Sequence, residues 1–291
     1  MPVPQEQTPE EKNSMNTYVI DPESAAEMVR LLQQDQLMTA GMGGVFPEVD
    51  LDGVQRVLDL ACGPGGWALD VAYHYSDLEV VGVDISERMI AYATAQAQVQ
   101  QRNNVSFHAM NILQPLDFPT ASFDLVNARF ISGFMLQDRW PRLFREILRV
   151  LRPGGIVRLS EPEAGFSNKL YFEKALHQGM LAMHRAGLNF SPNGYHFGIV
   201  HMLPSFFRQA GIPVLGKKAH FIEHSFGTPA HEGFAQELTT ALHLFEPLVV
   251  KTHVATPQEW QALSQAGLAQ MYEEDFCAAW IVVTVWGEKP L

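Results

Sequence analysis

The chain has 291 residues, of which 47% are hydrophobic and 18% charged, and its formal net charge is −12. Such a chain can bury a substantial core, but its acidic balance and the lack of any Lys/Arg run argue against nucleic acid as a partner. Two cysteines are too few for a disulfide framework, and no apolar run is long enough to cross a bilayer. With no signal peptide evident, we expect a cytoplasmic protein that does not bind membranes.

The N-terminal segment divides into a tail and an arm. Residues 1–14 are rich in Pro, Gln and Glu, which predicts a disordered tail. Asp21-Pro22 is typical of a helix start, and apolar residues then recur at helical spacing, so we expect a helix over 22–40. A glycine-rich turn ends this helix. The sequence therefore predicts a helical arm over 15–52, ahead of the main domain.

Strands and helices alternate in the region that follows the arm. Alternation of this kind predicts an α/β domain with a parallel sheet and right-handed crossovers. Ligands of such sheets bind outside the carboxyl ends of the strands, where Asp59, Asp84, Asn111 and Asn127 fall. The expected strands are 56–60, 79–84, 105–109, 123–128 and 155–160, and the expected helices are 66–75, 86–101 and 138–150.

The alternation breaks at residue 161. A helix is expected over 169–186, and a loop over 189–201 that is rich in aromatic residues and histidine. The remaining expected elements are helices at 203–211, 230–248 and 257–271, and strands at 218–226 and 276–286, the last of them buried.

A glycine loop follows the first strand of the alternating region. Asp59 ends the strand, and Gly63 and Gly65 let the backbone turn tightly and let a ligand approach it closely. Asp84 ends the next strand about 20 residues further on, where a carboxylate can accept both hydroxyls of a ribose. A dinucleotide-binding fold has the same spacing, with Gly63-x-Gly65-x-x-Ala68 as its loop. Asp59 instead favours a cofactor with a cationic amino-acid end.

Four segments of the same region carry further motifs, in order along the chain. They are Asp59-Leu-Ala-Cys-Gly-Pro-Gly-Gly, Val83-Asp-Ile-Ser-Glu-Arg-Met, Ser122-Phe-Asp-Leu-Val-Asn-Ala and Leu148-Arg-Val-Leu-Arg-Pro-Gly-Gly. Together they resemble motif I, the ribose-binding strand, the fourth strand and the turn into the fifth strand of the class I S-adenosylmethionine-dependent methyltransferases. The resemblance covers about residues 53–161. It implies a Rossmann-like α/β sheet of seven strands, with the last strand antiparallel between the fifth and the sixth, and S-adenosyl-L-methionine as the cofactor.

The resemblance also implies roles for the polar residues of the cofactor site. Asp59 would bind the methionine amine and Asp84 the ribose. Asn111 stands where the family commonly has an aspartate that accepts a hydrogen bond from the adenine amino group. An asparagine carbonyl can accept the same bond, so this departure is mild.

The apolar residues of the predicted site, and two polar residues at its edge, have two interpretations each. Ile85, Met89 and Ile112 would contact the faces of the adenine, or else pack in the core. Tyr18 could reach the cofactor carboxylate or merely pack the arm, and Arg129 could meet that carboxylate or a surface acid. The full predicted cofactor-binding set is Tyr18, Asp59, Ala61, Gly63, Gly65, Asp84, Ile85, Met89, Asn111, Ile112, Asn127 and Arg129.

Residues 161–204 resemble the cap that this family inserts to bind the acceptor, which leaves 53–160 and 205–291 as the cofactor-binding core. The aromatic residues of the cap favour a small hydrophobic or aromatic acceptor. Tyr195, His196 and His201 are candidates for a general base, although packed and solvated histidines are the favoured explanation of the pattern. No metal-ligand spacing occurs, so no metal is expected, and a homodimer is left open.

The predicted function is methyl transfer from S-adenosylmethionine to an O, N or C nucleophile of a small molecule (EC 2.1.1.-). One alternative is a non-catalytic S-adenosylmethionine-binding protein that regulates a partner. Others are a nicotinamide-dependent dehydrogenase and a methyltransferase fold that catalyses a different reaction. The motifs are specific for the cofactor and not for any acceptor.

Overall fold

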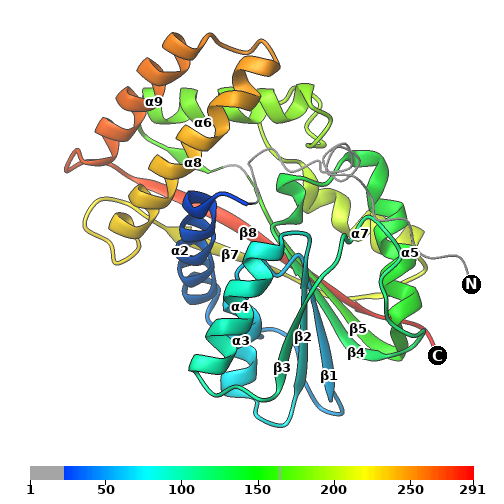
Figure 1. Cartoon of the computed structure of the whole chain (residues 1–291). Coiled ribbons are helices and arrows are strands. Elements are labelled where there is room, and N and C mark those ends of the chain that lie inside the picture. The colour runs from blue at the N-terminus through cyan, green and yellow to red at the C-terminus, as the bar shows by residue number, and fades with distance from the viewer. Residues whose placement is uncertain (1–22, 164) are drawn as a thin grey trace, which may run out of the picture.

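The computed structural model describes residues 23–163 and 165–291, so the predictions for the tail at 1–14, for Asp21-Pro22 and for Tyr18 lie outside the described residues. A central sheet with helices on both faces forms the lower part of the molecule in Figure 1, and a second group of helices lies above one end of the sheet. No helix within the described ranges combines the length and the apolar character needed to cross a membrane.

The sheet has the topology that the resemblance implies. Its strand order is β3-β2-β1-β4-β5-β8-β6, and β7 also pairs with β8. Strands β1 to β5 run parallel, and β8 runs antiparallel between β5 and β7, which confirms the predicted fold class. A two-residue strand, β6, brings the number of strands among the described residues to eight instead of seven. The strands are β1 Arg56–Leu60, β2 Glu79–Asp84, β3 Val105–Ala109, β4 Phe123–Arg129, β5 Leu151–Pro162, β6 Phe166–Ser167, β7 Val214–Glu223 and β8 Ala278–Glu288.

Three of the described helices, α2, α4 and α9, begin at a side-chain cap. Ser86 accepts a hydrogen bond from the backbone N–H of Met89 at 3.1 Å and opens α4. Thr256 forms a capping box with Glu259 and opens α9. Ser24 caps α2. The helices are α2 Ala25–Met42, α3 Gly66–His74, α4 Glu87–Val99, α5 Trp140–Val150, α6 Leu170–Arg185, α7 Ile199–Gln209, α8 His231–Lys251 and α9 Pro257–Met271.

Both faces of the sheet are buried, because successive strand residues point to opposite sides and each side is covered. Val57 and Leu58, neighbours in β1, are both fully buried, but in different clusters. The cluster of Val57 includes side chains of α3 and α4, and that of Leu58 includes side chains of α5 and α7. Each such side chain contributes roughly 1.5–3 kcal/mol by burial. The rigid sheet therefore fixes the carboxyl ends of β1, β2 and β4 relative to one another.

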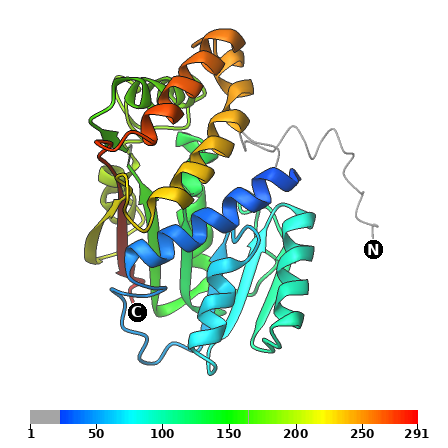
Figure 2. The same cartoon turned by 90° about the vertical axis from the view of Figure 1, so that its left-hand side faces the viewer.

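Helices α6, α8 and α9 pack together above the sheet and share a separate apolar cluster that contains Phe172 and Trp260. The sequence analysis limited the cap to 161–204 and assigned 205–291 to the core, whereas the structure adds α8 and α9 to α6. Helical periodicity reveals an apolar face but not the element that covers it, so the sequence could not show this pairing. Figure 2 shows α2 crossing the molecule between this upper group and the sheet, and α2 packs on both α8 and α3.

Candidate active site

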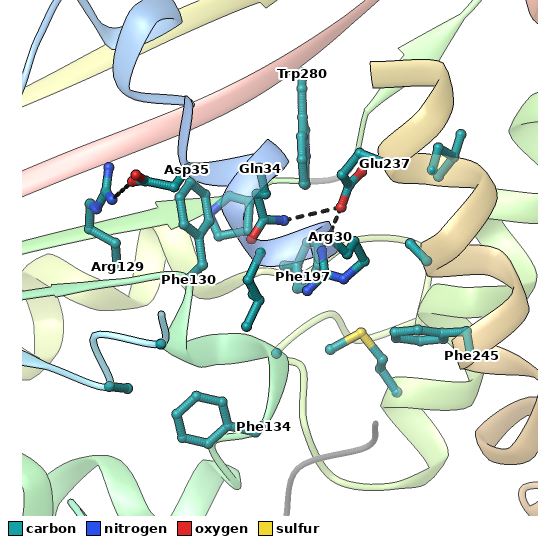
Figure 3. Close-up of a pocket in the computed structure, with 18 of the residues that line it drawn as sticks. Arg30, Gln34, Asp35, Arg129, Phe130, Phe134, Phe197, Glu237, Phe245 and Trp280 are labelled. Carbon is teal, nitrogen blue, oxygen red and sulfur yellow. Dashed lines mark hydrogen bonds and ion pairs between the residues drawn. The ribbon is translucent and has the colours of Figure 1, made fainter. Parts of the chain in front are cut away.

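A cavity of about 290 Å³ lies where the carboxyl ends of β1, β2 and β4 face α2, α6 and α8. Its half next to the sheet is lined by the glycine loop and by polar side chains at the strand ends. Its other half, next to the helices, is lined mostly by apolar side chains, several of which are shown in Figure 3. The cavity therefore joins the predicted cofactor site to a second, apolar compartment.

Asp59 lies at the end of β1 and lines the sheet side of the cavity. Only 4% of its surface is exposed, and its Oδ1 accepts a hydrogen bond from Asn127 Nδ2 at 2.7 Å. Burial raises the pKa of Asp59 to about 7, although the nearby Arg129 guanidinium and the Asn127 bond oppose the rise. Asn127 is itself held by Arg158, whose Nη1 donates to Asn127 Oδ1 at 2.7 Å. Asn127 does not line the cavity, so its role in the site is to orient Asp59.

Asp84 lies at the end of β2 and faces the same compartment. Its Oδ2 accepts a hydrogen bond from the backbone N–H of Gly63 at 2.9 Å, and its Oδ1 accepts one from Ser86, also at 2.9 Å. Burial raises the pKa of this carboxyl, and the two backbone bonds partly offset the rise. A carboxylate has about four acceptor positions, so Asp84 keeps acceptor capacity for a ligand hydroxyl.

The two glycines of the loop differ in function. Gly63 lines the cavity, as does Ala61, and its backbone can meet a ligand as predicted. Gly65 does not line the cavity. It has a φ of +82°, and a Cβ there would lie 2.7 Å from Ala93 Cβ and 2.8 Å from the Phe107 ring. Gly65 is therefore required for the packing of the loop on α4 and β3, and not for approach to a ligand.

The residues predicted to surround an adenine all line the cavity. Met89 and Ile112 are buried, while 39% of the Ile85 surface is exposed, which is unusual for a large apolar residue. Asn111 lies just beyond β3, and its Oδ1 accepts a hydrogen bond from the backbone N–H of Leu113 at 2.9 Å. The bond uses one of the two lone pairs of this oxygen, and the other remains for a donor in the cavity.

Comparison with known proteins agrees with this geometry. Residues 57–155 match the family of methyltransferase domains. A demethylmenaquinone methyltransferase of Lactococcus lactis is 35% identical over 109 residues, which cover 37% of this chain and 42% of that protein. The probable methyltransferase ltbC of Aspergillus luteorubrus is 28% identical over 202 residues, which cover 66% of this chain and 70% of that protein. The crystal structure of the [4+2]-cyclase SpnF aligns with a TM-score of 0.52 and 20% identity over 93% of this chain and 97% of that chain.

Residues 57–155 form a methyltransferase domain of the class I S-adenosylmethionine-dependent type. The family match contains both Asp59 and Asp84, and the SpnF alignment extends the common fold to nearly the whole chain. The aligned part spans less than half of the Lactococcus protein. The family match therefore establishes the family of residues 57–155, and the SpnF alignment establishes the fold. Neither identifies the acceptor, which must be inferred from the geometry of the cavity.

The cavity fits the cofactor of these methyltransferases. Asp59 Oδ1 is bound to Asn127, while Oδ2 has no partner within the described residues and is left for a cationic group. Ile85 offers an open apolar surface beside Asp84, suited to the flat face of a base. Arg129 also lines the cavity, but it pairs with Asp35 of α2, and its Nη1 donates to Thr39 Oγ1 at 3.0 Å. Arg129 was predicted to meet either the cofactor carboxylate or an acidic side chain, and in the structure it pairs with an acidic side chain.

The apolar compartment is formed by α6, α8 and the end of the sheet. Trp280 of β8 and Phe130, which follows β4, are part of its wall, together with Phe197 (Figure 3). Phe172 and Met180 of α6 lie on the opposite side. Of the aromatic residues noted in the predicted cap, Phe172 and Phe197 line the cavity. The other four, Phe166, Tyr171, Phe190 and Tyr195, do not.

The three candidates for a general base lie outside the cavity wall. Tyr195 is 52% exposed, and its ring packs 5.3 Å from that of His177. His196 Nδ1 lies 3.6 Å from Glu163 Oε1, and the His196 ring is 6.2 Å from that of His201. Of residues 189–198 only Phe197 lines the cavity, and His201, in α7, does not line it either, so the histidines that the sequence suggested are not placed to contact an acceptor. Among the described residues, no group of three or more His, Cys, Asp or Glu side chains could hold a metal ion.

Five polar residues of the cavity were missed by the sequence analysis: Arg30, Gln34 and Asp35 of α2, His224, and Glu237 of α8. A signal for Glu237 was present, because it shares a helix face with Phe234 and Leu238, which are buried. An acid on the apolar face of a helix is expected to be paired or functional. Its partner on α2 is 207 residues away in sequence, and no local pattern identifies such a pairing.

Proposed function

We propose that the protein transfers the methyl group of S-adenosylmethionine to an O, N or C nucleophile of a small hydrophobic or aromatic molecule. The observation that carries this proposal is the continuity of the cavity, which places the acidic strand ends opposite an apolar wall. α6, α8 and α9 would then form the acceptor-binding layer, and the sheet would bind the cofactor.

The cofactor side of the proposal assigns a role to each polar strand end. Asp59 would bind the methionine ammonium group, with Asn127 holding the carboxylate in orientation. Asp84 would accept hydrogen bonds from the ribose hydroxyls, and Asn111 Oδ1 would accept one from the adenine amino group. Ile85 would cover one face of the base, consistent with its exposed surface.

When bound, the cofactor supplies a methyl group on a sulfonium, which is the reactive part of the chemistry. The protein supplies position and exclusion of water. Holding two reactants at near-attack distance lowers a barrier by roughly 7–11 kcal/mol at most. Trp280, Phe130 and the side chains of α6 would hold an apolar acceptor against the strand ends, and their apolar surfaces favour acceptors of low polarity.

Calorimetric titration with S-adenosylmethionine, S-adenosylhomocysteine and NAD tests the cofactor. We expect the first two to bind and NAD not to bind. In Asp84→Ala we expect affinity to fall by at least about tenfold, because a hydrogen bond to a charged group contributes about 1.5–3 kcal/mol. Asp124→Ala is the matched control, since Asp124 Oδ2 also accepts from two backbone N–H groups, at 3.1 and 2.8 Å, but lies outside the cavity wall. Binding of NAD alone would refute the proposal.

A screen of aromatic and hydrophobic acceptors, with S-adenosylhomocysteine release as the readout, then tests catalysis. Release with one acceptor class identifies the substrate class. Tight cofactor binding without turnover on any acceptor would favour the non-catalytic regulatory alternative. Conversion of an acceptor without release of S-adenosylhomocysteine would show a reaction other than methyl transfer.

A further inference from the structure

Glu237 is a carboxylate in the otherwise apolar wall formed by α8. It is 4% exposed and lines the cavity, and its neighbours on the same helix face include Phe234, Leu238 and Ala241. Figure 3 shows its side chain directed toward Arg30 and Gln34 of α2. A buried acid in such surroundings is costly unless its charge is paired or used.

The two oxygens of this carboxylate have different surroundings. Oε1 accepts from Arg30 Nη1 at 2.5 Å and from Gln34 Nε2 at 3.4 Å. Oε2 accepts no hydrogen bond within the described residues, yet it is not one of the fully buried unpaired atoms, so it keeps accessible surface. Glu237 lines the cavity, and Oε2 is the oxygen of this carboxylate that remains available to a ligand.

Glu237 shares its cationic partner with a second carboxylate. Arg30 also binds Glu27, with Nε donating to Oε2 and Nη2 to Oε1, both at 2.7 Å. His224, which also lines the apolar compartment, has its pKa lowered to about 4 by burial and stays neutral. An anionic acceptor would bring a second negative charge against Glu237 Oε2, so this wall favours a neutral molecule that can donate a hydrogen bond.

Glu237 is also close to the cofactor side of the cavity. Leu31 follows Arg30 on α2, and its Cδ1 lies 3.6 Å from where a Cβ on Gly63 would stand. One turn of α2 therefore connects the glycine loop with the two donors that hold Glu237. The carboxylate lies near the junction of the two compartments, where an acceptor must present its nucleophile.

We propose that Glu237 is the catalytic base, and that the acceptor is a neutral, mainly apolar molecule with a phenolic or enolic hydroxyl. The inference rests on the proposed function. Oε2 accepts the hydroxyl hydrogen bond and then the proton. The acceptor O–H bond breaks, its electron pair stays on the acceptor oxygen as the nucleophile, and a new O–H bond forms on the carboxyl. The proton passes to water when the product leaves.

Two further properties of Glu237 suit this role. Burial raises the pKa of its carboxyl, with Arg30 opposing the rise, and a carboxylate with a raised pKa is a stronger base. The bonds from Arg30 and Gln34 fix Oε1, so the side chain needs no reorganisation when Oε2 takes the proton.

The test uses 2-naphthol, a photoacid that gives naphtholate emission when its hydroxyl contacts a proton acceptor. It is added to excess protein, with and without S-adenosylhomocysteine, and excited beyond the tryptophan absorption. Wild type and Glu237→Gln are compared. Glu27→Gln is the matched control, because Glu27 also binds Arg30 but is fully buried and lies outside the cavity wall. 2-Methoxynaphthalene, which has no hydroxyl proton, measures occupancy of the cavity, and circular dichroism verifies the fold.

We expect naphtholate emission from wild type and Glu27→Gln, and at least a fivefold loss of it in Glu237→Gln, with 2-methoxynaphthalene binding unchanged. Equal emission from wild type and Glu237→Gln would overturn the assignment, as would failure of 2-naphthol to bind the wild type. If Glu237→Gln does not fold, Glu237→Asp replaces it, because this variant withdraws the carboxylate by one methylene. Its naphtholate emission should be intermediate, and emission equal to that of wild type would contradict the assignment of Glu237 as the base. If the wild type does not bind S-adenosylhomocysteine but still differs from Glu237→Gln in naphtholate emission, the proposed function is refuted and the assignment of Glu237 is not.

Discussion

Replacement of Asp59 by asparagine should remove the pH dependence of cofactor binding. Burial raises the pKa of Asp59 to about 7, so the empty site holds a largely neutral carboxyl in mildly acid solution. A cationic amino group beside it favours the ionised form, and binding below pH 7 must therefore release a proton. For a group with a pKa of about 7, the apparent affinity falls about tenfold from pH 8 to pH 6, or about 1.4 kcal/mol.

S-adenosylhomocysteine is the suitable ligand, because it retains the amino group and lacks the sulfonium charge. We expect calorimetry at pH 6, 7 and 8 to show the tenfold change for wild type and a much flatter profile for Asp59→Asn. The titration of the ligand's own amino group is common to both proteins and cancels in the comparison. Asparagine keeps the oxygen that accepts from Asn127, so the local structure is preserved. Equal pH profiles for the two proteins would refute an ion pair at Asp59.

Two further substitutions test the fold around the site. Burial raises the pKa of Glu161 from the ordinary 4.5 to about 7. The folded state therefore favours the neutral carboxyl, and the resulting contribution to stability is complete below about pH 4.5 and is lost as pH rises through 7. Between pH 5 and 8, wild type should lose about 2–3 kcal/mol more of its unfolding free energy than Glu161→Gln, measured by urea titration, and parallel losses would contradict the buried neutral acid. Gly65→Ala should destabilise the protein by roughly 1–3 kcal/mol in the same assay, because the new Cβ would lie 2.7 Å from Ala93 Cβ at a φ of +82°. Wild-type stability of this variant would show that the loop can relax.

The cofactor side of the site could be predicted because its information is local. Strands 56–60, 79–84 and 105–109 were predicted with the bounds that the structure shows. The first two are short, mainly apolar segments, and in 105–109 apolar and polar residues alternate. Asp59 and Asp84 end two of these strands, and parallel pairing brings such ends to one edge of the sheet. The positions of Asp59 and Asp84 in the sequence were therefore sufficient to predict that these two side chains lie close together.

The acceptor side could not be predicted in the same way, because it depends on contacts between distant segments. Glu237 reaches the cavity only because α8 packs on α2, and Arg129 is occupied only because Asp35 lies on the same arm. His196 and His201 are predicted from their chemistry, but neither the loop that carries His196 nor α7, which carries His201, brings these side chains to the cavity wall. Residue type suggests what a side chain can do, whereas packing decides whether it can reach a substrate.

The insertion of β8 between β5 and β7 has a consequence for how the chain is made. β8 pairs along most of its length with both neighbours, and β7 pairs with no other described strand. Until residues 278–288 have left the ribosome, β5 has an open edge and β7 has no sheet to join. Exposed strand edges are templates for aggregation, and these pairings span large sequence separations that slow folding. A nascent chain that stalls before β8 should therefore depend on chaperones, whereas the full chain closes its own sheet.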